Sequence, residues 1–281
     1  MRKLTTLLWM SVLMMAVGCA TNSGLQTRIV AHRGASYDAP ENTATSFALA
    51  WKQDADAIEG DFYLTADGHI VCFHDRTTNR IAGVDMRVED ATLEQLQAMD
   101  VGRWKAPEFA GQRMPILAEV LDMVPPGKMI YLDIKSGPHI VAPMRDIIRQ
   151  SGLRPEQVVV IAFNADVIAK TRELMPELKT YWLSSFRQDK ETGIWTPSLE
   201  TVLATLTRID AHGLSSRGIR EVVDADFVRA IRAAGFEYHT WTINDADLAR
   251  YFYDLGADSI TTDRPGYIRE ALTAYQKQQS P

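Results

Sequence analysis

The sequence predicts an α/β fold of the (β/α)₈ type, a TIM barrel, with a small insertion after its second strand. Short apolar runs rich in β-branched residues recur along the chain, and helix-like segments separate them. Eight such repeats in roughly 240 residues match the usual size of this barrel. A doubly wound open sheet is the alternative that the same alternation allows.

Eight segments are predicted to be strands because each is a short run of apolar and β-branched residues bounded by turn signals. In chain order they are Arg28–His32, Ala57–Phe62, Met129–Ile134, Val158–Ala162, Lys179–Leu183, Arg208–Leu214, Glu237–Trp241 and Ser259–Thr261.

Helices are predicted between these strands from their end signals. Asn42 or Thr43 can cap the first helix, and a glycine or a proline follows the last turn of the others. The predicted helices are Asn42–Gln53, Val141–Ser151, Ala165–Met175, Asp224–Ala234 and Asp245–Leu255.

One interval, about 63–128, is twice as long as the usual step between parallel strands. Its start contains a hairpin turn at Thr65–Gly68 and a short apolar strand at Ile70–Phe73. Thr92 and Gln95 have the spacing of a capping box. We interpret this interval as an insertion on one face of the barrel, where Trp104, Pro107 and Phe109 could form a lid or a specificity wall.

The N-terminus has the pattern of an export signal. Arg2 and Lys3 precede an apolar run, Leu7–Val17, that is too short for a comfortable membrane span. Residues 1–18 are therefore expected to be a signal peptide. Cys19 follows Ala16-Val17-Gly18, which resembles the lipobox of bacterial lipoproteins, although leucine is usual at the place of Ala16.

This resemblance implies a lipidated cysteine at position 19, a small polar tether at 19–27 and a folded domain at 28–281. We expect an exported protein that is held to a membrane only by its lipid anchor and that faces the periplasm. A plain secreted protein is the alternative. If Cys19 carries lipid, Cys72 has no partner, and its apolar surroundings predict a small buried residue.

The composition excludes few functions. The chain has 281 residues, of which 46% are hydrophobic and 23% are charged, and its net charge is −6. These values are ordinary for a globular protein. The negative net charge argues against a nucleic-acid-binding surface, but it does not argue against a local positive pocket for a small anion.

Chemically active residues gather where the first three predicted strands end, at the face where such barrels hold their active sites. His32 ends the first strand, and Glu59 and Asp61 lie two apart on the second, so both carboxylates point to the same side. Asp133 and Lys135 repeat this spacing on the third. Three carboxylates favour Mg²⁺ or Ca²⁺ over zinc.

Seven motifs follow one another along the chain. They are His32-Arg33-Gly34, Pro40-Glu41-Asn42-Thr43, Glu59-Gly60-Asp61, His74-Asp75, Leu132-Asp133-Ile134-Lys135, Trp241-Thr242-Ile243-Asn244 and Thr262-Asp263-Arg264-Pro265. In this order and at this spacing, the chain resembles the glycerophosphodiester phosphodiesterase family from about Ile29 to Ile268. The resemblance implies a TIM barrel with a small insertion after strand two.

By this resemblance, His32 and His74 form the catalytic acid–base pair, and Glu59 and Asp61 bind a divalent metal. The third metal ligand comes from the third strand, where the family usually has glutamate and this chain has Asp133.

The resemblance also implies that Arg33 and Lys135 hold the phosphate oxygens and that Trp241 packs against the glycerol carbons. Glu41 is expected to support the site through hydrogen bonds near His32 and Arg33. Asp263 and Arg264 are expected to form only a structural turn before Pro265.

The resulting hypothesis is metal-dependent hydrolysis of glycerophosphodiesters to an alcohol and sn-glycerol 3-phosphate. Either a substrate hydroxyl or water could attack the phosphorus, and the sequence favours neither. Two alternatives keep the same barrel. One is a phospholipase that acts on intact or lyso-phospholipids, and the other is a non-catalytic phosphodiester-binding lipoprotein, for which the aspartate at position 133 is the only support.

Overall fold

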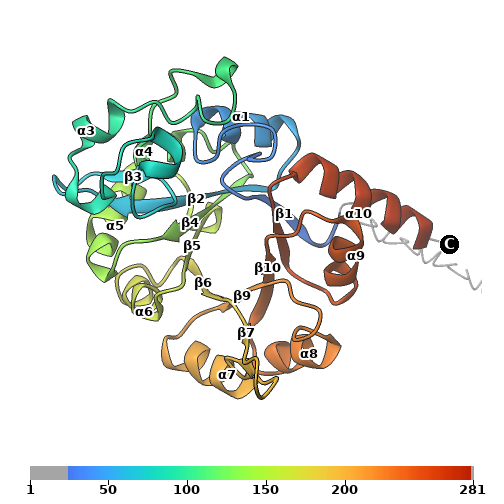
Figure 1. Cartoon of the computed structure of the whole chain (residues 1–281). Helices are drawn as coiled ribbons and strands as arrows, with labels where there is room; N and C mark the ends of the chain where they lie inside the picture. Colours follow the sequence, from blue (N-terminus) through green and yellow to red (C-terminus); the bar gives the residue numbers. More distant parts are fainter. Residues whose placement is uncertain (1–24, 280–281) are drawn as a thin grey trace, which may run out of the picture.

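The strands close into a barrel because β1 (Arg28–Ala31) pairs with both β11 (Ser259–Thr262) and β2 (Ala57–Leu64). The computed structural model describes residues 25–279. All eight barrel strands run parallel, and helices surround them (Figure 1). The predicted TIM barrel is confirmed, and the open-sheet alternative is wrong. The other barrel strands are β4 (Met129–Ile134), β5 (Val158–Ala162), β6 (Lys179–Ser184), β9 (Gly213–Arg217) and β10 (Glu237–Trp241).

The barrel strands are buried because helices cover their outer face and side chains fill the interior. Every residue of β5 is buried, as expected for a continuous apolar run in a parallel sheet. The main core lies between the strands and the helices, where Phe47, Leu117, Ile168 and Phe252 are fully buried. This packing fixes the carboxyl ends of the strands, from which the polar residues project.

The helices begin and end largely where their capping residues predict. Thr43 caps α1 with a capping box, and Asp224 and Asp245 cap α8 and α9. Gly235 and Gly256 follow the last turns with positive φ angles, which glycine adopts at no steric cost. The helices around the barrel are α1 (Ala44–Lys52), α4 (Leu117–Asp122), α5 (Val141–Gln150), α6 (Ala165–Leu174), α7 (Leu199–Arg208), α8 (Ala225–Ala233), α9 (Ala246–Asp254) and α10 (Pro265–Gln279).

The sixth predicted strand, Arg208–Leu214, was placed too early. Arg208 is the last residue of α7, which Ser198 caps and which the sequence analysis did not predict. Ile209 is apolar because it is buried at the helix end, and Asp210 then turns the chain with a φ of 52°. The strand itself is β9, Gly213–Arg217. A small hairpin, β7 (Arg187–Gln188) and β8 (Trp195–Thr196), also precedes α7 and was not predicted.

The long interval between β2 and β4 forms an insertion beside the barrel, drawn in cyan and green in Figure 1. Its strand β3 (Ile70–Cys72) extends β2 in antiparallel pairing, and α2 (Asn79–Ala82) and α3 (Leu93–Gln97) follow. Thr92 and Gln95 form the expected capping box. The insertion has a small core of its own, which includes Val88 and Leu96.

The predicted signal peptide, Cys19 and most of the predicted tether lie outside the described residues. Among residues 25–279, no helix is both long and apolar enough to cross a membrane. Cys72 is buried as predicted, and burial is the main reason that the pKa of its thiol lies well above the usual value.

Candidate active site

A cavity of about 170 Å³ opens where the barrel strands end. One side of it is charged and comes from the ends of β1, β2 and β4 and from the start of the insertion. The other side is mainly apolar and comes from β5, β6, β9 and β10. The lining residues are His32, Arg33, Glu59, His74, Asp133, Lys135, Ile161, Phe163, Leu183, Ser215, Trp241 and Thr261.

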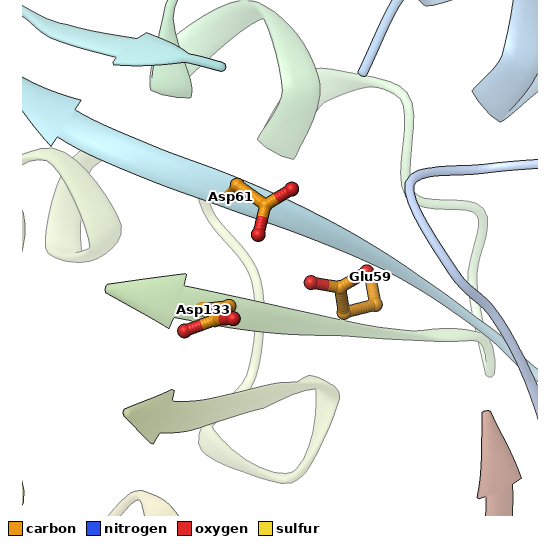
Figure 2. Close-up of side chains that lie close together, drawn as sticks. All are labelled: Glu59, Asp61 and Asp133. Carbon is orange, nitrogen blue, oxygen red and sulfur yellow. The ribbon is translucent and has the colours of Figure 1, made fainter. Parts of the chain in front are cut away.

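Three carboxylates lie together beside this cavity. Glu59 and Asp61 belong to β2, and Asp133 on the neighbouring β4 is paired in register with Asp61 (Figure 2). One oxygen of each residue lies within 4.8 Å of the others. Their exposed fractions are only 2%, 1% and 5%, so their negative charges repel one another with little screening by water.

The pKa values of this cluster reflect the mutual repulsion of its carboxylates, which a cation would relieve. Burial, together with repulsion from Asp61 and Asp133, raises the pKa of Glu59 to about 8. Burial raises the pKa of Asp133 to about 6, and repulsion from Asp61 contributes. Within the described residues, Oδ1 of Asp133 has no hydrogen-bond partner. Three buried oxygen ligands of this kind fit a hard divalent cation.

Two cationic side chains hold the carboxylates in place. Nζ of Lys135 lies 2.8 Å from Oδ1 of Asp61 and 2.5 Å from Oδ2 of Asp133, and Nε of Arg33 lies 3.2 Å from Oδ2 of Asp61. Burial alone would raise the pKa of Asp61, but Lys135 and Arg33 outweigh it and hold this pKa well below its usual range. Positive charge and the oxygens of the carboxylate cluster therefore occupy adjoining positions.

Asn42 is a further support of the cluster. Its Nδ2 donates to Oδ2 of Asp61 at 2.7 Å, and its Oδ1 accepts from the Asp61 amide at 3.2 Å. Asn42 adopts a φ of 56°, the left-handed conformation that asparagine tolerates better than most residues. The sequence analysis considered Asn42 only as a helix cap.

Each of the two predicted catalytic histidines is oriented by a carboxylate. Nδ1 of His32 lies 2.6 Å from Oδ1 of Asp263, and Nδ1 of His74 lies 2.6 Å from Oδ1 of Asp75. Asn244 in turn donates to the other oxygen of Asp263 at 2.5 Å. Because Nδ1 is engaged in both rings, Nε2 is the nitrogen available for proton transfer in the cavity.

The two imidazoles differ in their electrostatic surroundings. Burial lowers the pKa of His32, but the hydrogen bond to Asp263 and the charge of Glu59 outweigh it and raise the pKa. Burial also lowers the pKa of His74, and the charges of Arg33 and Lys135 lower it further, so this pKa lies below the usual value despite Asp61 and Asp75. Such a divergence favours opposite roles in proton transfer.

The turn after β1 positions Arg33. Its amide donates to Oε2 of Glu59 at 2.8 Å, and its backbone has a φ of 55°. Gly34 follows with a φ of 79°, and a Cβ there would lie 2.4 Å from Oγ of Ser46. Only glycine therefore lets this turn pack against the start of α1.

Glu41 links Arg33 to the insertion. Its Oε1 accepts from Nη1 of Arg33 at 3.0 Å and from Nη2 of Arg80 at 2.7 Å. Nε of Arg80 also donates to Oδ2 of Asp75 at 2.6 Å. A continuous series of charged contacts thus joins Arg33 to His74. No sequence motif marks Arg80, so its role is not predictable from the sequence alone.

An aromatic pair forms the apolar wall. Trp241 and Phe163 contact each other edge to face with ring centroids 5.5 Å apart, and Nε1 of Trp241 donates to the Ser215 carbonyl at 3.1 Å. Phe163, which follows β5, was not predicted. The expected wall of Trp104, Pro107 and Phe109 does not line this cavity.

The structure therefore brings eight of the nine predicted site residues of the folded domain together at this cavity. The ninth, Glu41, does not line the cavity but accepts a hydrogen bond from Arg33. Asp263 was predicted to be part of a structural turn, but its carboxylate instead binds the ring of His32. Asp263 belongs to the last of the seven motifs, and this is the sequence signal that could have indicated a role in the site.

The model of the glycerophosphoryl diester phosphodiesterase family matches residues 32–267. The chain belongs to this family. A glycerophosphodiester phosphodiesterase of Caldanaerobacter subterraneus is 29% identical over 246 residues, which cover 86% of this chain and 96% of that protein. One from Bacillus subtilis is 29% identical over 264 residues, covering 88% and 86% of the two chains.

A solved structure extends this similarity to three dimensions. A phosphodiesterase of Oleispira antarctica, in complex with the product sn-glycerol-3-phosphate, has a TM-score of 0.78 and 27% identity. The match covers 87% of this chain and 96% of that chain. As a member of the glycerophosphoryl diester phosphodiesterase family, this protein is an enzyme, and the non-catalytic alternative is not supported.

Proposed function

We propose that this phosphodiesterase hydrolyses glycerophosphodiesters to an alcohol and sn-glycerol 3-phosphate with a divalent cation and the pair His32 and His74. One observation carries the proposal. Two imidazoles, each oriented by a carboxylate, border the same cavity as the cationic side chains Arg33 and Lys135, and a cluster of three buried carboxylates lies beside it.

Glu59, Asp61 and Asp133 would hold the cation, and Mg²⁺ or Ca²⁺ suits their all-oxygen set. When bound, the cation would supply positive charge that neutralises a phosphate oxygen. Aspartate at position 133 is compatible with this role, because its Oδ1 is buried and has no hydrogen-bond partner among the described residues.

Arg33 and Lys135 would bind the phosphate oxygens. A phosphodiester carries one negative charge, and charge builds up on its oxygens in the transition state. Donors that are already fixed in position stabilise that charge without reorganising. The contacts of Arg33 with Glu41 and of Lys135 with Asp61 provide this rigidity.

The histidines would move the protons. One imidazole takes a proton from the attacking oxygen through Nε2, and the other gives one to the leaving alkoxide. Asp263 and Asp75 keep Nδ1 of each ring engaged, so the correct tautomer faces the cavity. Trp241 and Phe163 would pack against the carbons of the glycerol.

The direct test is an assay of the full-length protein in detergent with a panel of glycerophosphodiesters and Mg²⁺, Ca²⁺ or Mn²⁺. We expect release of sn-glycerol 3-phosphate with at least one of these cations. Turnover of lysophospholipids in preference to the water-soluble diesters would favour the phospholipase alternative instead.

We also propose that the protein is exported and lipidated at Cys19, which leaves the barrel facing the periplasm. The N-terminal sequence is the support for this proposal. Metabolic labelling with a fatty-acid analogue should mark the wild-type protein but not Cys19→Ser. Labelling of both proteins, or of neither, would contradict lipidation at this residue.

A further inference from the structure

A second hollow, of about 580 Å³, adjoins the catalytic cavity. Phe163 and Leu183 line both spaces, so these two side chains are the boundary between them. Phe163 is 48% exposed, and its carbonyl accepts a hydrogen bond from Nε1 of Trp182 at 3.0 Å. A substrate group that extends past Phe163 and Leu183 can therefore reach this hollow.

The hollow carries positive charge. Two of its lining residues are arginines, and no carboxylate residue lines it. The lining residues other than Phe163 and Leu183 are Ala165, Trp182, Ser184, Ser185, Arg187, Pro197, Thr201, Thr205 and Arg208.

Both arginines are free to bind an anion. Within residues 25–279, neither Arg187 nor Arg208 forms an ion pair, although the protein has an excess of acidic residues. By contrast, Arg172 pairs with Asp210, and Arg232 pairs with Asp258. Unpaired guanidinium groups beside a hollow favour phosphate, to which they can donate two parallel hydrogen bonds.

Hydroxyl groups also line the hollow. Ser184 ends β6 and is buried, and Ser185 follows it. In the part of the chain that the structure describes, neither side chain forms a hydrogen bond. Hydroxyl groups next to guanidinium groups suit a polyol that carries a phosphate.

We propose that this hollow binds a second anionic group of the substrate, namely a further phosphate joined to the scissile phosphodiester through a short polyol such as glycerol. The inference rests on the proposed function and names its preferred substrates. A cationic alcohol such as choline would be repelled by Arg187 and Arg208. An acyl chain would remove these two charges from water without pairing them, which is unfavourable.

The test compares two substrates that differ by one glycerophosphate unit, which brings the second phosphate. Glycerophosphoglycerol has one phosphodiester, and bis(glycerophospho)glycerol has a second one attached through the central glycerol. For the wild-type enzyme we expect the higher kcat/KM with bis(glycerophospho)glycerol, and we expect this advantage to decrease as salt is added, because the added ions screen the contacts.

The double variant Arg187→Gln, Arg208→Gln should lower the ratio of the two kcat/KM values by roughly three- to tenfold, the usual effect of losing two exposed charge contacts. The loss should appear in KM. Arg149→Gln, a change to an exposed arginine on α5 that forms no ion pair within the described residues, should leave the ratio unchanged. An unchanged ratio in the double variant, or a higher rate with lysophosphatidylglycerol than with either diester, would overturn the inference.

A failure of the proposed function gives a different result, because neither diester would then be hydrolysed. In that case, calorimetric binding of bis(glycerophospho)glycerol still tests the hollow. Binding that is weakened in the double variant but not in Arg149→Gln supports the site, and equal binding to all three proteins overturns it.

Discussion

Nδ1 of His32 lies 2.6 Å from Oδ1 of Asp263, although 231 residues separate them in the chain. The barrel brings them together because β1 and β11 are neighbouring strands. Asn244 and Ser36 also donate to the Asp263 carboxylate, so its position is fixed from several sides. Asp263 is therefore a positioning residue for the proposed proton transfer by His32.

Asp263→Asn should shift the pH dependence of catalysis. The carboxylate attracts the protonated ring and so raises the pKa of His32. Without that charge the ring loses its proton at lower pH, and the limb of the kcat/KM profile that reports His32 should move to lower pH. The rate should also fall by roughly 10- to 100-fold, because the ring is less well held. A drop in rate with an unmoved limb would argue against this electrostatic role, and the exposed Asp247→Asn is the control.

His32→Ala and His74→Ala should each lower kcat by roughly 10²- to 10⁴-fold, the usual contribution of acid–base catalysis by one group. Circular dichroism and thermal unfolding should show an intact fold. His139 is exposed and lies outside the cavity, so His139→Ala should retain wild-type turnover. Near wild-type turnover of either of the first two variants would contradict the acid–base assignment.

Removal of divalent cations with EDTA should abolish turnover, and added Mg²⁺ or Ca²⁺ should restore it. The cation should also stabilise the fold, by about 2.7 kcal/mol at a concentration 100 times its Kd. Glu59→Gln keeps an oxygen that can accept from the Arg33 amide but cannot offer a carboxylate to the cation, so its Tm should not rise when the cation is added. If Tm is the same with and without cation in the wild type, the carboxylate cluster is not a metal site.

Arg80→Gln should lower kcat/KM by roughly tenfold, a typical effect of losing a residue that orients a catalytic group. Arg80 joins Glu41 to Asp75 and therefore connects the insertion to both Arg33 and His74. Arg87 forms ion pairs within the insertion only, so Arg87→Gln is the matched control. Equal rates in the two variants would mean that the connection has no catalytic role.

Much of the fold follows from local sequence signals, because apolar strand runs and helix caps act over a few residues. The wrong strand prediction at Arg208–Leu214 also comes from a local signal, a short apolar run. Ile209 and Ala211 are apolar because they are buried at the end of α7, and a short run of this kind predicts a strand or a buried helix end equally well.

The residues whose roles were not predicted have no such local signal. Asp263 contacts His32 and Arg80 contacts Glu41, and both partners are distant in the sequence, so only the folded chain shows which groups meet. The grouping of the carboxylates was easier to predict, because Glu59 and Asp61 lie two apart on one strand and the side-chain alternation of a strand places them on the same side.

The closure of the barrel between β1 and β11 also determines when His32 acquires its carboxylate partner during folding. His32 comes near the beginning of the folded chain, and its partner Asp263 follows the last barrel strand. A nascent chain therefore has no oriented His32 until nearly all of it has been synthesised and the final strand has docked. Any truncation before residue 263 removes this carboxylate and leaves the ring of His32 without its partner, even where the first strands fold.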